Sequence, residues 1–316
     1  MKFSHNLAYS HFATGRLLHL ALVFLTCANV ALGFLTRPPK IDTHHHFVPD
    51  FYAEALTEAG GDPSGWPTPQ WSPELSLENM KENGINKAIL SLTAPGATIA
   101  ETDQGARQLA RRANMYAAGL RDKHRDRFGF FAAMPSLMDV NGTLAEVKYA
   151  LDVLKADGVT LFTRYGDENN YLGHEIFAPI WSELDKRKAV VFIHPTHPVD
   201  LARVNPLLPQ PSIDYPQETT RAAVDMIISN VTQQYPNCVR ILSHAGGTLP
   251  YLMSRLAVTS RATRYTKKTW GKTYDDLMDD FRSFHYDLAL SSSPAVLELL
   301  LELVPYDHIT YGKPQA

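Results

Sequence analysis

The segment Ile41-Asp-Thr-His-His-His-Phe47 decides how the rest of the sequence is interpreted. In a strand, alternate residues share a face, so His44 and His46 point to one side and His45 points to the other. Two imidazoles about 7 Å apart along one strand face can bind one divalent ion. An isolated pair is more often a polar strand end exposed to water, so the other strand ends have to be compared with it.

Two further strand-like runs end in a histidine. Residues 189 to 193 lead into His194, and residues 239 to 243 lead into His244. A buried structural histidine would explain either one alone. In α/β barrels, however, the active site is assembled at the carboxyl ends of the strands, so residues far apart in sequence converge at one mouth. Four histidines at three strand ends therefore predict a shared site.

Short β-branched or aromatic runs alternate with longer amphipathic stretches, which predicts parallel strands joined by helical crossovers. The eight predicted strands are residues 41–47, 87–93, 127–134, 158–163, 189–195, 238–245, 283–291 and 307–312. The predicted helices include residues 76–83, 102–124, 143–156, 177–187, 219–234 and 294–303. An open doubly wound sheet is the alternative, but its first turn is often rich in glycine, whereas the first turn here is rich in histidine. We therefore predict an α/β fold, a (β/α)8 TIM barrel.

Two long insertions interrupt this pattern. Residues 50 to 74 are rich in glycine, proline and tryptophan, so we expect a structured loop over one mouth of the barrel rather than a helix. Residues 198 to 216 contain five prolines, and we expect a second loop with little regular structure.

Composition limits the classes of function. A chain of 316 residues with 45% hydrophobic side chains can bury the core of one barrel domain. The formal net charge of −3 gives no basic surface for phosphate backbones, so nucleic acid is an unexpected partner. Cys27 and Cys238 are too few for a disulfide framework or a cysteine-based zinc site. Any metal must be held by histidines and carboxylates.

The N-terminal part has a different composition. Residues 17 to 35 carry no formal charge, follow Arg16 and contain the small-residue sequence Ala31-Leu-Gly. We interpret residues 1–36 as a leader or membrane anchor and residues 39–316 as the barrel domain. A signal peptide, a signal anchor and a wrongly assigned first exon all remain open. A true leader predicts the secretory pathway or a membrane, and the alternative is the cytosol.

Three segments resemble the metal-binding and catalytic segments of the amidohydrolase-related decarboxylases, the family of aminocarboxymuconate-semialdehyde decarboxylase. These segments are Ile41-Asp-Thr-His-His-His-Phe, Val191-Phe-Ile-His-Pro and Ser243-His-Ala-Gly-Gly. The resemblance covers roughly residues 39 to 312 and is strongest to the fungal 6-methylsalicylate decarboxylase group. It rests there on Gly61-Asp-Pro-Ser-Gly-Trp-Pro-Thr-Pro, Leu90-Ser-Leu-Thr-Ala-Pro-Gly and Tyr171-Leu-Gly-His-Glu-Ile-Phe-Ala-Pro-Ile-Trp.

The resemblance implies a metal site and a reaction. One divalent ion, zinc in the first place and manganese in the second, would be bound by His44, His46 and His194. His244 would hydrogen-bond a metal-bound water or the substrate. The implied activity is the non-oxidative decarboxylation of a small hydroxylated aromatic acid, 6-methylsalicylate to m-cresol, in fungal polyketide secondary metabolism. Family habit further implies a homodimer.

The C-terminal end departs from the family pattern. In the family, the eighth strand leads into Gly-Ser-Asp or Gly-Thr-Asp, and the Asp is a metal ligand. Here the chain has Gly312-Lys-Pro-Gln-Ala, with Lys313 in place of the small residue. We expect that this ending reflects a misread exon boundary or a truncated paralogue. Asp287, in the seventh predicted strand, is a candidate substitute ligand, and a structural role is the alternative.

Three residues are candidates for substrate contact. Arg164 follows the fourth predicted strand and can pair with a carboxylate, or it can be a solvated surface arginine. Trp66 and Thr93 are candidate walls for an aromatic ring, and packing is the alternative for both.

Three functions remain in competition. Decarboxylation is the first, and hydrolysis of an ester, lactone or amide is the second, because the same ion can activate water for attack on a carbonyl. The third is a catalytically impaired, truncated paralogue.

Overall fold

The computed structural model describes residues 38–262 and 270–313. The predicted leader, residues 17 to 35, lies outside the described residues, so the predicted boundary at residues 36 to 39 stays a prediction. None of the described helices is long and apolar enough to cross a membrane. From Lys40 onward the chain forms one compact unit.

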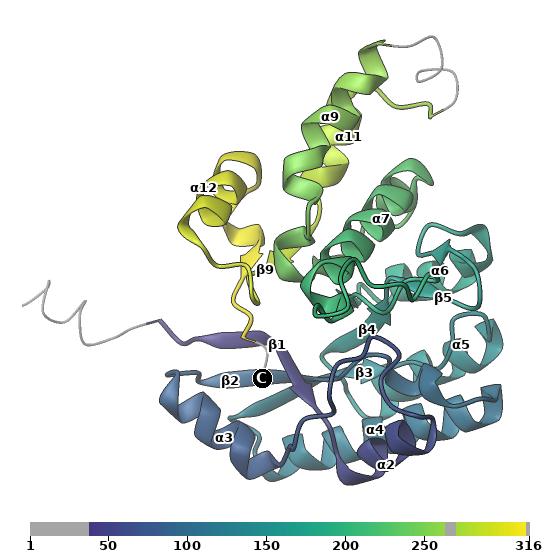
Figure 1. The fold of residues 1–316 in the computed structure, drawn as a ribbon, viewed down its shortest axis with the longest axis vertical. Helices are drawn as coiled ribbons and strands as arrows, with labels where there is room; N and C mark the ends of the chain where they lie inside the picture. Colours follow the sequence, from purple (N-terminus) through teal and green to yellow (C-terminus); the bar gives the residue numbers. More distant parts are fainter. Residues whose placement is uncertain (1–37, 263–269, 314–316) are drawn as a thin grey trace, which may run out of the picture. The chain divides into compact units, whose positions relative to one another are not determined.

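The described part of this unit is built on eight parallel strands that form one continuous, nearly closed sheet (Figure 1). In spatial order they are β1 (Ile41–Phe47), β2 (Lys87–Leu92), β3 (Phe128–Ala133), β4 (Gly158–Phe162), β7 (Val190–His194), β8 (Val239–Leu242), β9 (His285–Asp287) and β10 (Ile309–Thr310). Each of them lies within a predicted strand, so the predicted (β/α)8 barrel is confirmed. The predictions for β8, β9 and β10 are too long, because 3₁₀ turns at His244–Gly246 and Tyr306–His308 and an irregular segment after Asp287 replace parts of these predicted strands.

The first and last strands meet at a seam. The backbone N–H of Thr43 donates to the carbonyl of Tyr311 at 2.9 Å, and its hydroxyl donates to the same carbonyl at 3.0 Å. The backbone N–H of Lys313 donates to Asp42 Oδ1 at 3.0 Å. These bonds hold β10 against β1 and bring the C-terminal strand next to the histidine segment.

Helices pack around the strands (Figure 1). They are α2 (Asp50–Glu58), α3 (Pro73–Glu82), α4 (Asp103–Lys123), α5 (Val140–Lys148), α6 (Ala178–Lys186), α7 (Asp214–Ile228), α8 (Val231–Gln234), α9 (Leu249–Ala262), α11 (Tyr274–Arg282) and α12 (Pro294–Leu303). A short hairpin, β5 (Arg164–Tyr165) with β6 (Asn170–Tyr171), follows β4.

Helix α4 shows how local sequence produces these elements. Thr102 caps its first turn, with the hydroxyl accepting the N–H of Gly105. One face is lined by small buried side chains at helical spacing, Ala106, Ala110, Ala113 and Ala117. The small side chains let the helix pack closely on β3.

One prediction about the first insertion is wrong. Residues 50 to 74 were expected to form a loop without a helix, but Asp50–Glu58 is helix α2. Tyr52 and Leu56, four residues apart, are buried on one face of α2, which anchors the helix to the core. The turn-forming glycines and prolines begin only at Gly60, and the rest of the segment up to α3 is irregular as predicted. The second insertion also agrees with its prediction up to α7, apart from one short helical turn at Gln210–Ser212.

The lumen of the barrel is packed below the strand ends. Ile89, Phe131, Phe192 and Ile241 form a separate buried cluster, and the rings of Phe131 and Phe192 stack with centroids 5.6 Å apart. Such layers of side chains fill the interior of this fold. The ring of Phe192 also contacts His44 edge-on, with centroids 5.0 Å apart, so the histidines lie directly on an apolar floor.

Candidate metal centre and active site

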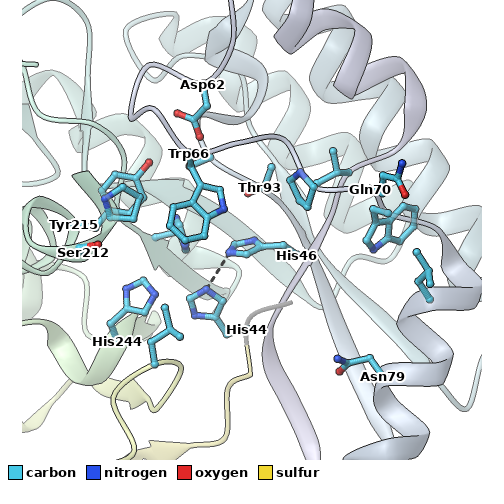
Figure 2. Close-up of a pocket in the computed structure, with 18 of the residues that line it drawn as sticks. His44, His46, Asp62, Trp66, Gln70, Asn79, Thr93, Ser212, Tyr215 and His244 are labelled. Atoms are coloured by element: carbon cyan, nitrogen blue, oxygen red, sulfur yellow. Dashed lines mark hydrogen bonds between the residues drawn. The ribbon is translucent and has the colours of Figure 1, made fainter. Parts of the chain in front are cut away.

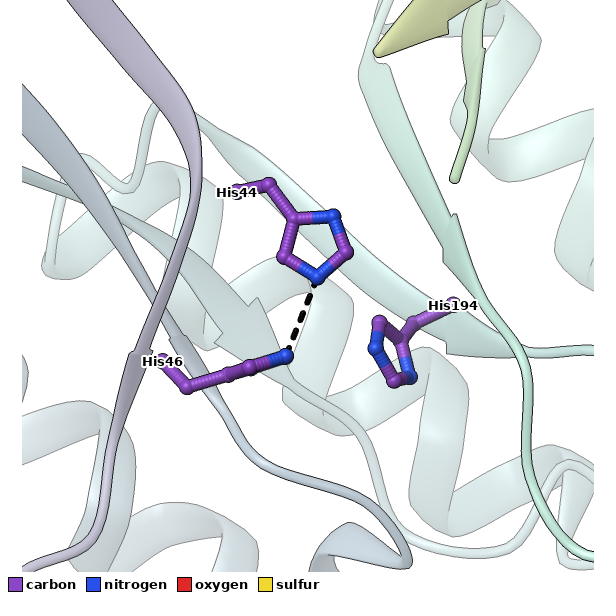
Figure 3. A group of neighbouring side chains, drawn as sticks. All are labelled: His44, His46 and His194. Atoms are coloured by element: carbon purple, nitrogen blue, oxygen red, sulfur yellow. Dashed lines mark hydrogen bonds between the residues drawn. The ribbon is translucent and has the colours of Figure 1, made fainter. Parts of the chain in front are cut away.

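Three histidines from two strands converge above this floor. His44 and His46 come from β1 and His194 from the end of β7, and one ring nitrogen of each lies within 4.8 Å of the others (Figure 3). The Nε2 atoms of His44 and His46 are 3.0 Å apart. Nitrogen ligands on a tetrahedral zinc at ~2.0–2.1 Å from the ion lie about 3.4 Å from each other. The three rings therefore need only small shifts to bind one ion.

Oxygen partners occupy the opposite side of each ring. His44 Nδ1 is 2.8 Å from Asp287 Oδ2, His194 Nδ1 is 2.7 Å from the Pro195 carbonyl, and His46 Nδ1 is 3.4 Å from Ser91 Oγ. A carboxylate and a carbonyl can only accept, so Nδ1 of His44 and Nδ1 of His194 carry the proton. Their Nε2 lone pairs are thereby available to a metal.

The electrostatics of the cluster favours neutral rings. Burial, followed by the neighbouring His44 and His244, holds the pKa of His46 well below its usual value. Burial, followed by His46 and His44, does the same to the pKa of His194. A neutral imidazole is the form that binds a metal. The donor set thus fits a divalent ion such as zinc or manganese, as the sequence suggested.

His244 lies beside the three ligand candidates. It begins a 3₁₀ turn, His244–Gly246, directly after β8, and its ring centroid is 5.0 Å from that of His44 and 5.7 Å from that of His194. Burial lowers the pKa of His244 to about 4. Its Nδ1 is buried with no hydrogen-bond partner among the described residues. The ring is thus a neutral group with free bonding capacity next to the candidate metal centre.

Asp287 does not join the ligand cluster. It is fully buried at the end of β9 and contacts His44 on Nδ1, the side of the ring that faces away from His46. Burial raises the pKa of this carboxyl, but His44, His244 and the Ala289 N–H together outweigh burial, so the net pKa lies below the usual value. Between the two roles that the sequence left open, the geometry favours the structural one.

The histidines open into a cavity of about 570 Å³ (Figure 2). Trp66 and Thr93, both expected to contact substrate, are among the residues that line it. Sequence reasoning missed three further lining residues, Asp62 and Leu290 from two loops and Tyr215 from the first turn of α7. Burial raises the pKa of Asp62 and that of Tyr215. No periodic pattern marks these three residues, because Asp62 and Leu290 lie in irregular segments and Tyr215 lies at the very start of a helix.

Arg164 lies away from this cavity. Its guanidinium donates to the carbonyls of Gly166 at 2.7 Å and His197 at 3.5 Å, and the residue is only 6% exposed. It is not among the described residues that line the cavity. In fact, none of those lining residues is a lysine or an arginine, whereas Asp62, Glu78 and Glu82 are acids.

The third histidine of the first strand has a separate set of contacts. His45 is fully buried, with Nδ1 2.9 Å from Asp42 Oδ2 and Nε2 3.1 Å from Ser76 Oγ on α3. The indole N–H of Trp71, a cavity-lining residue, donates to the same Ser76 oxygen at 2.9 Å. The alternation within the strand is therefore confirmed, since His45 faces a helix while its two neighbours face the lumen.

Comparisons with known proteins agree with this geometry. A sequence model of the amidohydrolase family matches residues 41–312. The 6-methylsalicylic acid decarboxylase of Penicillium expansum is 49% identical over 273 residues, which are 86% of this chain and 83% of that protein. Among solved structures, an amidohydrolase II is 32% identical and covers 86% of each chain with a TM-score of 0.78. A 2,6-dihydroxybenzoate decarboxylase, crystallised with 2,6-dihydroxybenzoate, is 25% identical and covers 88% of each chain with a TM-score of 0.72. We conclude that the chain belongs to the amidohydrolase family.

Proposed function

We propose that the protein is a metal-dependent decarboxylase of a small hydroxylated aromatic acid, and that it converts 6-methylsalicylate to m-cresol in fungal polyketide secondary metabolism. The observation that carries this proposal is the cluster of His44, His46 and His194 beside His244 at the floor of an aromatic-walled cavity. The similarity to a named 6-methylsalicylic acid decarboxylase supports the choice of substrate.

Charge in the cavity supports the need for a metal. Because none of its described lining residues is a lysine or an arginine, the cavity offers a substrate carboxylate no cationic side chain, and a bound cation would supply the missing charge. We propose zinc, with manganese as the alternative, held by His44, His46 and His194. When bound, the ion supplies Lewis acidity, orienting the carboxylate and the ortho-hydroxyl and stabilising negative charge as carbon dioxide leaves.

The chain's own residues orient the ring and hold the proton. Trp66 and Tyr215 offer apolar faces on which an aromatic ring can stack, and Leu290 lies at the rim. The ring carbon that loses carbon dioxide needs a proton from an acid within reach. Asp62 is our candidate for this acid, because it lines the cavity and burial raises its pKa. His244, neutral and with an unpartnered Nδ1, is suited to hold the substrate oxygen in place.

The test is a product analysis with purified, metal-loaded protein. We expect 6-methylsalicylate to disappear while m-cresol and carbon dioxide form in equal amounts, measured by liquid chromatography and by trapped carbon dioxide. A strong chelator and the variant His194→Ala should both abolish turnover, and readdition of metal should rescue only the chelated wild type. The same assay with salicylate and with 2,6-dihydroxybenzoate measures which ring substituents the protein accepts.

Two other outcomes would contradict the proposal. Cleavage of aryl esters or lactones without release of carbon dioxide would identify a hydrolase that uses the same ion. Substoichiometric metal together with no turnover of any acid would identify a catalytically impaired relative.

Location and assembly belong to the same proposal. We propose a secretory or membrane location if residues 17 to 35 act as a leader, which fractionation of cells expressing the full chain would test. A homodimer is proposed from the family resemblance, and light scattering of the purified protein would test it.

A further inference from the structure

Asp287 connects the ring of His44 to the backbone of two turns that line the cavity. Its Oδ2 accepts from His44 Nδ1 at 2.8 Å. Its Oδ1 accepts the backbone N–H of Ala289 at 2.9 Å and that of His244 at 3.3 Å. We propose that Asp287 is a positioning residue that fixes the tautomer of His44 for metal binding and holds the turns carrying His244 and Leu290. This inference rests on the metal site of the proposed function.

The tautomer follows from the chemistry of the two partners. An ionised carboxylate has no proton to donate, so the hydrogen bond forms only when His44 Nδ1 carries the proton. A neutral imidazole then has its lone pair on Nε2, the atom that faces His46. Without the carboxylate, His44 is free to adopt the other tautomer, which places an N–H where a metal should bind.

The second carboxylate oxygen holds two strained backbone segments. His244 has a φ of 56°, and Leu290, the residue after Ala289, has a φ of 54°. A side chain in this left-handed region costs energy, and it persists only where surrounding contacts hold it. Both residues line the cavity, so the two N–H bonds to Oδ1 help to fix part of its wall.

The packing around the pair excludes water. Asp287 and His44 are both 0% exposed. Gly312, which follows β10, packs against both residues. A Cβ atom at this position would lie 2.9 Å from His44 Cβ and 3.0 Å from Asp287 Oδ1. A hydrogen bond to a charged group is stronger in such a dry environment than in water. Any side chain at position 312 would therefore clash with His44 and Asp287, which accounts for the glycine.

The variant Asp287→Asn separates the two tasks of the carboxylate. The amide has nearly the same shape, and its oxygen can still accept the N–H groups of Ala289 and His244. Its NH₂ group then faces His44 Nδ1 and donates to it, which reverses the polarity of that one bond. We expect zinc affinity, measured by competition with a chromophoric chelator, to fall 10- to 100-fold, the usual effect of losing such an outer partner.

A second readout needs neither activity nor metal. Nitrogen-15 NMR of the metal-free protein reports which ring nitrogen carries the proton, and the His44 signals are assigned by comparison with His44→Gln. We expect the Nδ1–H form in the wild type and the Nε2–H form in Asp287→Asn. A wild type with the Nε2–H form would overturn the proposal, even if the variant does not fold.

Asp280 provides a matched control. It is also buried, and it accepts hydrogen bonds from Thr232 Oγ1 and Lys272 Nζ on the outer layer. Asp280→Asn should lower the melting temperature but leave zinc affinity and the His44 tautomer unchanged. An equal loss of zinc affinity in both variants, or unchanged affinity in Asp287→Asn, would contradict the positioning role. If the wild type binds neither zinc nor manganese, the proposed function fails, whereas the tautomer measurement still decides the role of Asp287.

Discussion

Mild acid should destabilise the metal-free protein through its buried histidines. The pKa of His244 is about 4, and those of His46 and His194 are also below the usual value. Below about pH 6.5 the unfolded chain takes up protons on these rings, while the folded protein does not until its own lower pKa is reached. Protonation therefore favours unfolding, and stability falls as the pH falls through this window.

The magnitude can be worked out for His244. A group that binds one proton only in the unfolded state changes the free energy of unfolding by about 1.4 kcal/mol per pH unit. Between pH 6.5 and pH 4.5, His244 alone should remove roughly 2–3 kcal/mol of stability. Glu218 and Asp225 act in the opposite direction, because burial raises the pKa of both carboxyls and their protonation favours the folded state. The contribution of His244 must therefore be isolated by a variant.

Urea denaturation of chelator-treated protein at pH 7, 6 and 5 measures the effect. Between pH 7 and pH 5, His244→Asn should reduce the loss of unfolding free energy by roughly 2 kcal/mol relative to the wild type. Gln108→Ala, at an exposed position without a titratable group, should leave the dependence of stability on pH unchanged. If the free energy of unfolding depends on pH equally in the wild type and in His244→Asn, the reasoning is refuted, because His244 then does not stay neutral in the folded protein.

Three further predictions concern single residues. His194→Ala removes one of three ligands, and we expect at least a 100-fold weaker retention of zinc, measured by elemental analysis after dialysis. Ser76→Ala removes the oxygen that both the Trp71 indole and His45 Nε2 contact, and it should cost about 1–3 kcal/mol in urea denaturation; a neutral result would mean that these two contacts add nothing. Leu290→Gly relieves a left-handed φ and should stabilise the fold by about 1 kcal/mol while raising KM, and a loss of stability would contradict the strain.

The barrel and the ligand cluster could be predicted because both depend on strand periodicity. Alternation within β1 placed His44 and His46 on one face, and the apolar runs of β7 and β8 placed His194 and His244 at strand ends. In a parallel barrel all such ends meet at one mouth, whatever the loops do. The positions of these four residues therefore follow from register alone.

The walls of the cavity could not be predicted, because they depend on tertiary contacts. Asp62 and Tyr215 come from an irregular loop and from the first turn of α7, and no repeat marks either residue. Arg164 was expected at the mouth because it follows β4, but the β5–β6 hairpin turns the chain there, and local carbonyls take its guanidinium. Helix α2 was missed because the glycines and prolines after it dominated the composition of the insertion.

The segment Ile41–Phe47 stabilises the closure of the barrel as well as positioning His44 and His46. Pairing between β1 and β2 shifts register between Asp42 and His45, which marks a bulge in the strand. Bulges near active sites redirect side chains and leave backbone groups unpaired, and here Asp42 Oδ1 accepts one of them, the N–H of His44, at 3.0 Å. The same oxygen accepts the N–H of Lys313, and this bond holds the segment after β10 against the bulge. Any change that straightens this bulge must therefore disturb the histidine cluster and barrel closure together, because one short stretch of backbone positions both.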